Sequence, residues 1–226
     1  MIAVVWPAPA GRTQHKSLAA EWHDGQVDLY IAGAGGVGRE AYDAALAAGV
    51  RVRAFLDDRL AGTSVRGLPV LAPADAPTGA GYLVGIADPR VRLRLVNLLE
   101  ERGLAPATVI HPRSIIGPDT TLGNGCVVLG GAHISSSIRI GNHCQVHYNA
   151  TVGHDTVFAD RVTVYPGANV SGSVFLDEDV TIGSNAVVLQ GLKIGKGTFV
   201  GAGAVVTRDL GSGLVVVGAP ARPLQR

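Results

Sequence analysis

Residues 146–170 read VHYNATVGHDTVFADRVTVYPGANV, and an apolar residue stands at every sixth position of this stretch. The same spacing continues in both directions, from Ile110 to Val206. A second set of positions, four residues after each apolar one, holds small or aliphatic residues. Such a sustained register indicates a repeat architecture in the C-terminal half of the chain. The apolar positions are Ile110, Ile116, Leu122, Val128, Ile134, Ile140, Val146, Val152, Phe158, Val164, Val170, Leu176, Ile182, Val188, Ile194, Val200 and Val206.

The period of six predicts a particular kind of repeat. An α-helix repeats every 3.6 residues and a flat strand every two, so six residues must combine a short strand with a corner. Three such hexads close a triangular coil of eighteen residues, and coils stacked at roughly 4.8 Å form a parallel β-helix. Both sets of positions face its interior. Glycines follow many of the apolar residues, and we interpret them as supplying backbone freedom at the corners; they are Gly117, Gly123, Gly141, Gly153, Gly183, Gly195 and Gly201.

The first half of the chain has a different organisation. A short apolar strand over 28–32 is followed by GAGGVG at 33–38 and by a helical pattern over 37–48. A second strand over 51–56 ends at Asp57 and Asp58. This arrangement offers backbone amides and a helix N-terminus to a phosphate, and a carboxylate to a ribose hydroxyl. The alternative is that the glycines serve only as a tight turn between strand and helix.

The rest of this half is too short for a complete dinucleotide fold. One further strand over 81–87 and one helix over 89–102 lead directly into the repeat. Only one mononucleotide-binding half fits, whereas a dinucleotide needs two. The sequence therefore favours an α/β domain that holds a single nucleotide and disfavours a nicotinamide enzyme.

Composition excludes several classes of partner. The net charge of +1 gives no reason to expect a nucleic acid. No apolar run approaches the roughly eighteen residues of a membrane span, and the run Ile2–Val5 is too short for a signal peptide. We therefore expect a soluble, cytoplasmic protein. Cys126 and Cys144, eighteen residues apart on the inward register, are interpreted as reduced core residues rather than a disulfide.

The repeat register resembles that of the hexapeptide-repeat acyltransferases. With the small domain before it, the chain is similar to one branch of that family, from residue 28 to residue 226. These are the bacterial N-acetyltransferases of nucleotide-linked amino sugars, such as those of bacillosamine and perosamine synthesis, and the related sialic acid O-acetyltransferases. The resemblance implies a Rossmann-like α/β half domain followed by a left-handed parallel β-helix. We accordingly expect an unassigned extension at 1–27, a nucleotide-sugar-binding domain at 28–108, a β-helix at 109–207 and a coenzyme-binding tail at 208–226.

His154 is the candidate general base among seven histidines, since histidine is the usual base near neutral pH. It is third in its hexad, an outward position, and Gly172 one coil later leaves space for a thioester. The stretch from Asn149 to Asp155 also resembles the catalytic motif of the branch. In that motif the histidine is the base and the next carboxylate, here Asp155, orients it.

The resemblance implies further site residues, a cofactor and an assembly. Acetyl-CoA is expected as co-substrate, with no metal, in a homotrimer whose coenzyme lies between subunits. Its contacts would be Thr163, Gly172, Ser184, Gly201, Ala202 and Arg222. The nucleotide-linked amino sugar would contact Gly35, Gly36, Val37, Asp57, Asp58, His147 and Asn149. The segment 85–88 with Arg90 or Arg92 resembles a Gly-Asp-Asn-x-x-Arg stretch of the branch, with Pro89 replacing the asparagine.

Three alternatives to N-acetylation remain open. The first is acetyl transfer to a sugar hydroxyl. The second is a γ-class carbonic anhydrase, which shares the β-helix and binds zinc through histidines; here His111, His143 and His147 are the candidates. The third is a binding protein that has kept the fold without turnover.

Overall fold

The computed structural model describes residues 28–224, so the predicted extension 1–27, including Ile2–Val5, lies outside the described residues. The chain divides into two compact units. The first runs to residue 112 and includes residues 124–126, and the second comprises residues 113–123 and 127 onward. No helix within 28–224 is long and apolar enough to cross a membrane.

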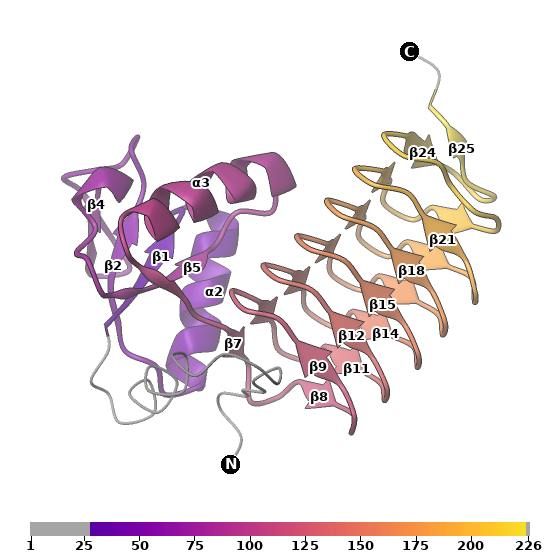
Figure 1. The fold of residues 1–226 in the computed structure, drawn as a ribbon, viewed down its shortest axis with the longest axis horizontal. Helices are drawn as coiled ribbons and strands as arrows, with labels where there is room; N and C mark the ends of the chain where they lie inside the picture. Colours follow the sequence, from indigo (N-terminus) through magenta and orange to yellow (C-terminus); the bar gives the residue numbers. More distant parts are fainter. Residues whose placement is uncertain (1–27, 225–226) are drawn as a thin grey trace. The chain divides into compact units, whose positions relative to one another are not determined.

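The first unit is built on a mixed six-stranded sheet (Figure 1). Its order is β3 (Ser64–Val65), β4 (Leu68–Leu71), β2 (Val52–Leu56), β1 (Leu29–Ala32), β5 (Gly81–Val84) and β6 (Ala105–Pro106). All neighbours are parallel except β3 and β4. Helices α2 (Gly36–Ala47) and α3 (Pro89–Glu101) and the 3-10 turn η1 (Pro73–Asp75) complete the unit. The α/β class expected from the sequence is confirmed.

Two details of this unit differ from the expectation. Strand β5 ends at Val84, three residues before the expected end, because the chain turns at Gly85 to begin the approach to α3. The hairpin β3–β4 was not predicted. Its turn places Arg66 and Gly67 at φ values of 54° and 77°, as a tight hairpin requires, but arginine is an uncommon residue there and gives no sequence signal.

The second unit is a parallel β-helix, as predicted, made of three sheets of short strands. The first sheet contains β7 (Val109–Ile110), β10 (Val127–Val128), β13 (Gln145–Val146), β16 (Thr163–Val164), β19 (Thr181–Ile182), β22 (Phe199–Val200), β24 (Val215–Val217) and β25 (Arg222–Pro223). The second contains β8 (Ile115–Ile116), β11 (His133–Ile134), β14 (Thr151–Val152), β17 (Asn169–Val170), β20 (Val187–Val188) and β23 (Val205–Val206). The third contains β9 (Thr121–Leu122), β12 (Arg139–Ile140), β15 (Val157–Phe158), β18 (Phe175–Leu176) and β21 (Lys193–Ile194).

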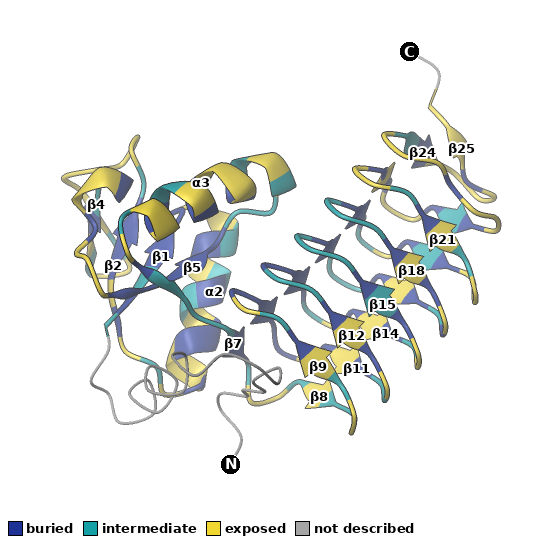
Figure 2. Cartoon of the chain, in the orientation of Figure 1, coloured by how far each residue is buried: buried dark blue, intermediate teal, exposed yellow. Residues whose placement is uncertain are grey.

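Successive strands of one sheet pair in a register of eighteen residues, such as Thr151 with Asn169. The residues on the sixfold register fill the interior, where Val152 and Val170 are each 2% exposed (Figure 2). The second set of inward positions is equally buried, as at Ala150 and Ala168. The two cysteines are buried, and neither forms a disulfide. Apolar side chains from both sets therefore fill the interior of the β-helix along its length.

The role assigned to the corner glycines was wrong. None of these seven glycines has a positive φ. They are needed instead because the coils approach closely: a Cβ on Gly153 would lie 2.4 Å from the amide nitrogen of Gly172. The left-handed conformation falls two residues later, where short polar residues are common since they tolerate it. The non-glycine examples, with φ between 55° and 61°, are Asp119, Ser137, His143, Asn149, Asp155, Arg161, Ser173, Asp179 and Asn185.

The expected tail continues the stack before it ends. Val215 and Val216 of β24 pair in parallel with Phe199 and Val200 of β22. Strand β25 then turns back and pairs antiparallel with β24. Val216 is fully buried, so this part of the chain closes the apolar interior.

Candidate active site

His154 and Asp155 form an exposed pair at the corner that follows β14. The His154 Nδ1 lies 2.8 Å from Oδ2 of Asp155, and the two side chains are 55% and 62% exposed. A carboxylate can only accept, so Nδ1 carries the proton and Nε2 presents its lone pair to solvent. This arrangement gives the imidazole the tautomer that a general base needs.

The backbone holds this corner on both sides. The carbonyl oxygen of His154 accepts a hydrogen bond from the amide of Ser173 on the next coil, at 2.7 Å. The amide of Asp155 donates to the carbonyl of Ser136 on the preceding coil, at 3.3 Å. Asp155 occupies the left-handed position of its hexad, with φ 58°. The pair is thus fixed by the coil stack, although both side chains face solvent.

Gly172 lies against the imidazole ring of His154. A Cβ built on it would lie 2.7 Å from Nε2 of His154 and 2.8 Å from Cε1. The ring therefore occupies the space that a side chain at position 172 would fill. The structure brings together His154, Asp155 and Gly172, which are three of the predicted site residues.

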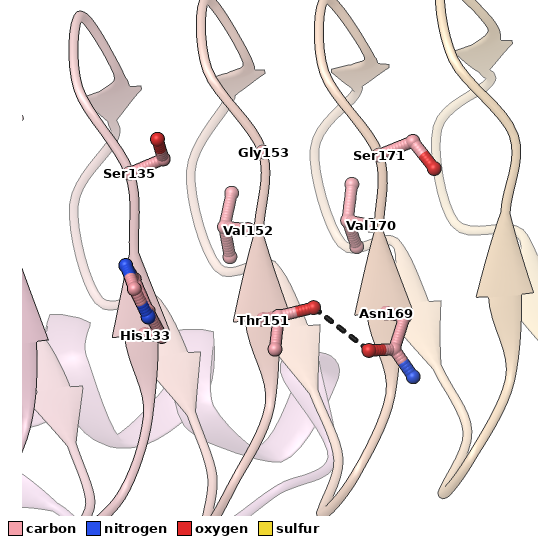
Figure 3. Close-up of a pocket in the computed structure, with 8 residues that line it drawn as sticks. All are labelled: His133, Ser135, Thr151, Val152, Gly153, Asn169, Val170 and Ser171. Carbon is pink, nitrogen blue, oxygen red and sulfur yellow. Dashed lines mark hydrogen bonds between the residues drawn. The ribbon is translucent and has the colours of Figure 1, made fainter.

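A shallow hollow of about 410 Å³ lies beside this corner, over the second sheet (Figure 3). Gly153 and Ser171, the residues immediately before His154 and Gly172, are part of its wall. The sequence analysis did not identify this hollow. Its lining comes from three consecutive coils: His133, Ser135, Thr151, Val152, Gly153, Asn169, Val170 and Ser171.

The other coenzyme candidates do not lie at the His154 corner. Ser184 and Ala202 follow β19 and β22 of the first sheet, whereas Gly172 follows β17 of the second. Gly201 is required by packing, because a Cβ there would lie 2.8 Å from Cγ1 of Val217. Arg222 is exposed in β25, and its Nη1 donates to the carbonyl of Ala221 at 2.8 Å. One chain therefore presents the predicted coenzyme residues on two different corners.

His147, Asn149 and Thr163 also lie away from His154. His147 is 2% exposed, and its ring lies against Tyr165 with centroids 5.2 Å apart. Thr163 in β16 is fully buried. Asn149 is exposed at a corner of the first sheet, where its side chain covers Gly131. Within one chain, none of the three faces the imidazole of His154.

The carbonic anhydrase alternative would require a zinc site at His111, His143 and His147. Among residues 28–224, no group of three or more histidine, cysteine, aspartate or glutamate side chains is arranged to hold a metal ion.

The glycine-rich turn of the first unit contains two kinds of glycine. Gly33 has φ 102°, and a Cβ on Gly38 would lie 1.9 Å from the carbonyl oxygen of Gly33, so the turn itself needs both. Gly85 packs against the same turn, since its Cβ would lie 2.5 Å from Cα of Gly38. Gly35 and Gly36 differ, because a Cβ on either would meet nothing within 4 Å. The fold does not require them, which leaves their exposed backbone for a ligand.

The two aspartates after β2 have different surroundings. Asp57 accepts hydrogen bonds from the amides of Ala34 and Arg59, at 3.2 Å and 3.0 Å, so it braces the glycine turn. Asp58 is exposed, and Val37 is partly exposed in the first turn of α2. Of the two carboxylates, Asp58 is the more accessible to a ribose.

The segment at 85–88 serves α3. The Asp88 side chain caps this helix by accepting from the amides of Arg90 and Val91, at 2.9 Å and 3.0 Å. Arg92 is 1% exposed, and its Nη2 donates to the carbonyl of Ala87 at 2.8 Å. Both side chains thus stabilise the start of the helix.

The His154–Asp155 pair lies at a corner of a β-helix that follows a small α/β unit in the chain. This combination is typical of one class of acyltransferase. Comparison with known families supports this class: residues 173–208 match the bacterial transferase hexapeptide model, and residues 28–99 match the PglD N-terminal domain. The chain is also 35% identical over 181 residues to GDP-perosamine N-acetyltransferase of Escherichia coli O157:H7, covering 76% of this chain and 82% of that protein. The chain belongs to the hexapeptide-repeat acetyltransferases with a PglD-type N-terminal domain.

Solved structures agree with this assignment. The acetyltransferase domain of PglB from Neisseria gonorrhoeae in complex with acetyl coenzyme A is similar with a TM-score of 0.82 and 32% identity, over 87% of this chain and 98% of that one. PerB from Caulobacter crescentus in complex with CoA and GDP-perosamine is similar with a TM-score of 0.82 and 29% identity, over 88% of this chain and 97% of that one.

Proposed function

We propose that this protein is an acetyl-CoA-dependent N-acetyltransferase that acts on the amino group of a nucleotide-linked sugar. The observation that carries the proposal is the exposed His154–Asp155 pair, whose imidazole ring lies over Gly172. The substrates named for two similar proteins, GDP-perosamine and acetyl coenzyme A, fit the same chemistry.

The residues at this corner suit acyl transfer to an amine. The amine nitrogen attacks the thioester carbonyl carbon while His154 Nε2 removes its proton. Asp155 stabilises the imidazolium that forms. The tetrahedral intermediate then collapses, the carbon–sulfur bond breaks, and the proton passes from His154 to the departing thiolate. Backbone amides near Gly172 would hold the oxyanion during this step.

The glycine turn of the first unit would hold the nucleotide. Gly35, Gly36 and the amide of Val37 stand at the N-terminus of α2, where backbone N–H groups favour phosphate. Asp58 would accept from a ribose hydroxyl, and Asp57 would keep the turn in shape.

We further propose a homotrimer in which two chains complete each coenzyme site. Support comes from the two corners on which one chain carries its coenzyme candidates: Gly172 on one, Ser184 and Ala202 on the other. A site that uses both sets needs a second copy, as in a cyclic assembly. A cytoplasmic location fits two cysteines that do not form a disulfide.

Complementation would test the shared site. His154→Ala and Ala202→Trp should each be inactive alone, while co-expressed chains should regain roughly a quarter of wild-type activity by random mixing. Light scattering should give the mass of three chains. If the two variant chains form a mixed assembly but activity does not recover, the result would contradict a coenzyme site shared between chains.

The activity itself is tested with acetyl-CoA and a panel of nucleotide-linked amino sugars. We expect release of coenzyme A together with a product heavier by one acetyl group on nitrogen. Acylation of sugars that carry only hydroxyl groups would instead indicate an O-acetyltransferase. Background release of coenzyme A with every acceptor would refute the proposed function.

A further inference from the structure

The hollow beside His154 is polar in a way that the rest of its sheet is not. Three residues in register, His133, Thr151 and Asn169, point outward from β11, β14 and β17 (Figure 3). Ser135 and Ser171 add hydroxyl groups at its edge. No lysine, arginine, aspartate or glutamate is among the lining residues.

This polar character is confined to the coils around His154. On the same sheet, the outward residue before His133 is Ile115, which is 58% exposed. The outward residues after Asn169 are Val187 and Val205. The polar outward residues of this strand position therefore coincide with the coils next to the candidate base.

The orientation of the polar groups in the hollow is fixed. The Thr151 hydroxyl donates to Oδ1 of Asn169 at 2.8 Å (Figure 3). Nδ2 of Asn169 donates to the carbonyl of Gly167 at 2.9 Å. The Thr151 oxygen can therefore accept from a ligand, and Asn169 has a second N–H to give. Side by side, one acceptor and one donor match a hydroxyl pair of a sugar.

We propose that this hollow is the subsite for the hydroxyl groups of the acceptor sugar ring, with Thr151 and Asn169 as its specificity-determining residues. The proposal rests on the proposed function and deepens it. A lining of hydroxyl, amide and imidazole groups suits an uncharged polyol, whereas a phosphate would call for cationic side chains.

The geometry of the coil stack supports this occupant. Adjacent coils are roughly 4.8 Å apart, so groups on two coils can reach hydroxyls on opposite sides of one hexose ring. His133 is one coil from Thr151 on the side away from Asn169 and would meet a third polar group. Gly153, in the wall of the hollow, joins Thr151 and Val152 directly to His154, so a ring held there lies beside the base.

The test is a steady-state comparison of Thr151→Val and Asn169→Leu, substitutions that keep shape and remove hydrogen bonding. The acceptor is the nucleotide-linked amino sugar with the highest wild-type turnover. We expect the KM for this acceptor to rise about 5–10-fold in each variant, as for a lost neutral hydrogen bond, and the KM for acetyl-CoA to stay within about twofold. The matched control is Thr121→Val, an exposed outward threonine on β9 of the third sheet, which should change neither KM.

Deoxygenated acceptors provide a second readout. If Asn169 binds a ring hydroxyl, removing that hydroxyl should weaken the wild type and should add no further loss to Asn169→Leu, as in a double-mutant cycle. A rise in the KM for acetyl-CoA alone would assign the hollow to the pantetheine arm and overturn the proposal. Unchanged constants in folded variants would do the same.

These outcomes are separable from failure of the proposed function. An inactive wild type with every acceptor would refute the acetyltransferase assignment itself. An active wild type with unaltered variants would refute only the subsite. If a variant no longer unfolds cooperatively, two other measurements test the subsite. They are the acceptor KM of His133→Ala and the KM of the wild-type protein for deoxygenated acceptors.

Discussion

Two corners of the same β-helix show what distinguishes a reactive position from a structural one. At the corner after the third sheet, the side chains of Arg161 and Lys196 each bond to a carboxylate one coil away. Arg161 Nε donates to Asp179 Oδ1 at 2.6 Å, and Lys196 Nζ donates to Glu178 Oε2 at 2.7 Å. At the corner after β14, the residue one coil beyond His154 is Gly172.

The backbone is the same at both corners, since Asp155 and Arg161 have φ values of 58° and 61°. The difference lies in the side chain one coil away. Where that side chain is an ionic partner, the corner stabilises the stack; where it is absent, as at Gly172, the imidazole ring of His154 takes its place. Substitutions at either corner test whether the side chain one coil away accounts for this difference.

The largest effect is expected from His154→Ala. Loss of a general base should lower kcat by about two to four orders of magnitude. The melting temperature should stay close to that of the wild type, because the side chain is 55% exposed. Turnover and thermal unfolding are measured on the same preparation. Near-normal turnover would remove His154 from the mechanism.

Gly172→Ala should be the next most damaging. Its methyl group would lie 2.7 Å from Nε2 of His154, so the ring must turn away from the thioester. A displacement of this size should reduce kcat by about 10- to 100-fold. Gly211→Ala is the control, because the nearest atom to its Cβ is 4.0 Å away. Equal kinetic effects of the two substitutions would contradict the steric explanation.

Arg161→Met should affect stability and leave catalysis intact. The guanidinium is 12% exposed and bonds to Asp179 and Glu178, so its removal leaves two carboxylates without this partner. We expect a loss of about 1–3 kcal/mol, between the values for surface and buried pairs. Thermal unfolding measures the loss. A marked fall in kcat with unchanged stability would show that this corner takes part in the reaction.

The smallest effect is expected from Lys196→Met, and it depends on pH. The hydrogen bond from Lys196 is the main reason that the pKa of Glu178 is lowered. A lowered folded pKa stabilises the fold above the unfolded value of about 4.3, and this contribution is lost as the pH falls through the folded pKa. The variant should melt at most about 2 °C lower at pH 7. The difference from wild type should shrink as the pH falls below about 4.3 and disappear only below the lowered pKa of Glu178. A constant difference across that range would exclude the ion pair as its cause.

Much of the fold could be predicted because the apolar register alone determines it. Counting hexads placed Val152 and Val170 in the interior and His154 outside. The same count could have separated the coenzyme candidates, since Ser184 lies twelve residues after Gly172 and twelve is not a multiple of eighteen.

Other features depend on contacts that no spacing reveals. Gly153 looks like a conformational glycine until the next coil is seen 2.4 Å from its Cβ position. Gly85 stands far from the glycine turn in sequence but packs on it. The hydrogen bond between the Thr151 and Asn169 side chains requires particular rotamers. The polar arrangement in the hollow beside His154 therefore could not be predicted from residue spacing.

The eighteen-residue register has a consequence for how such proteins diverge. Each strand within the stack pairs with the equivalent strand one turn before and one turn after, as β14 pairs with β11 and β17. Whole turns can therefore be inserted or deleted during evolution while each remaining corner keeps its orientation. The number of turns beyond Gly172 can therefore change the length of the β-helix while the corner that carries His154 keeps its geometry.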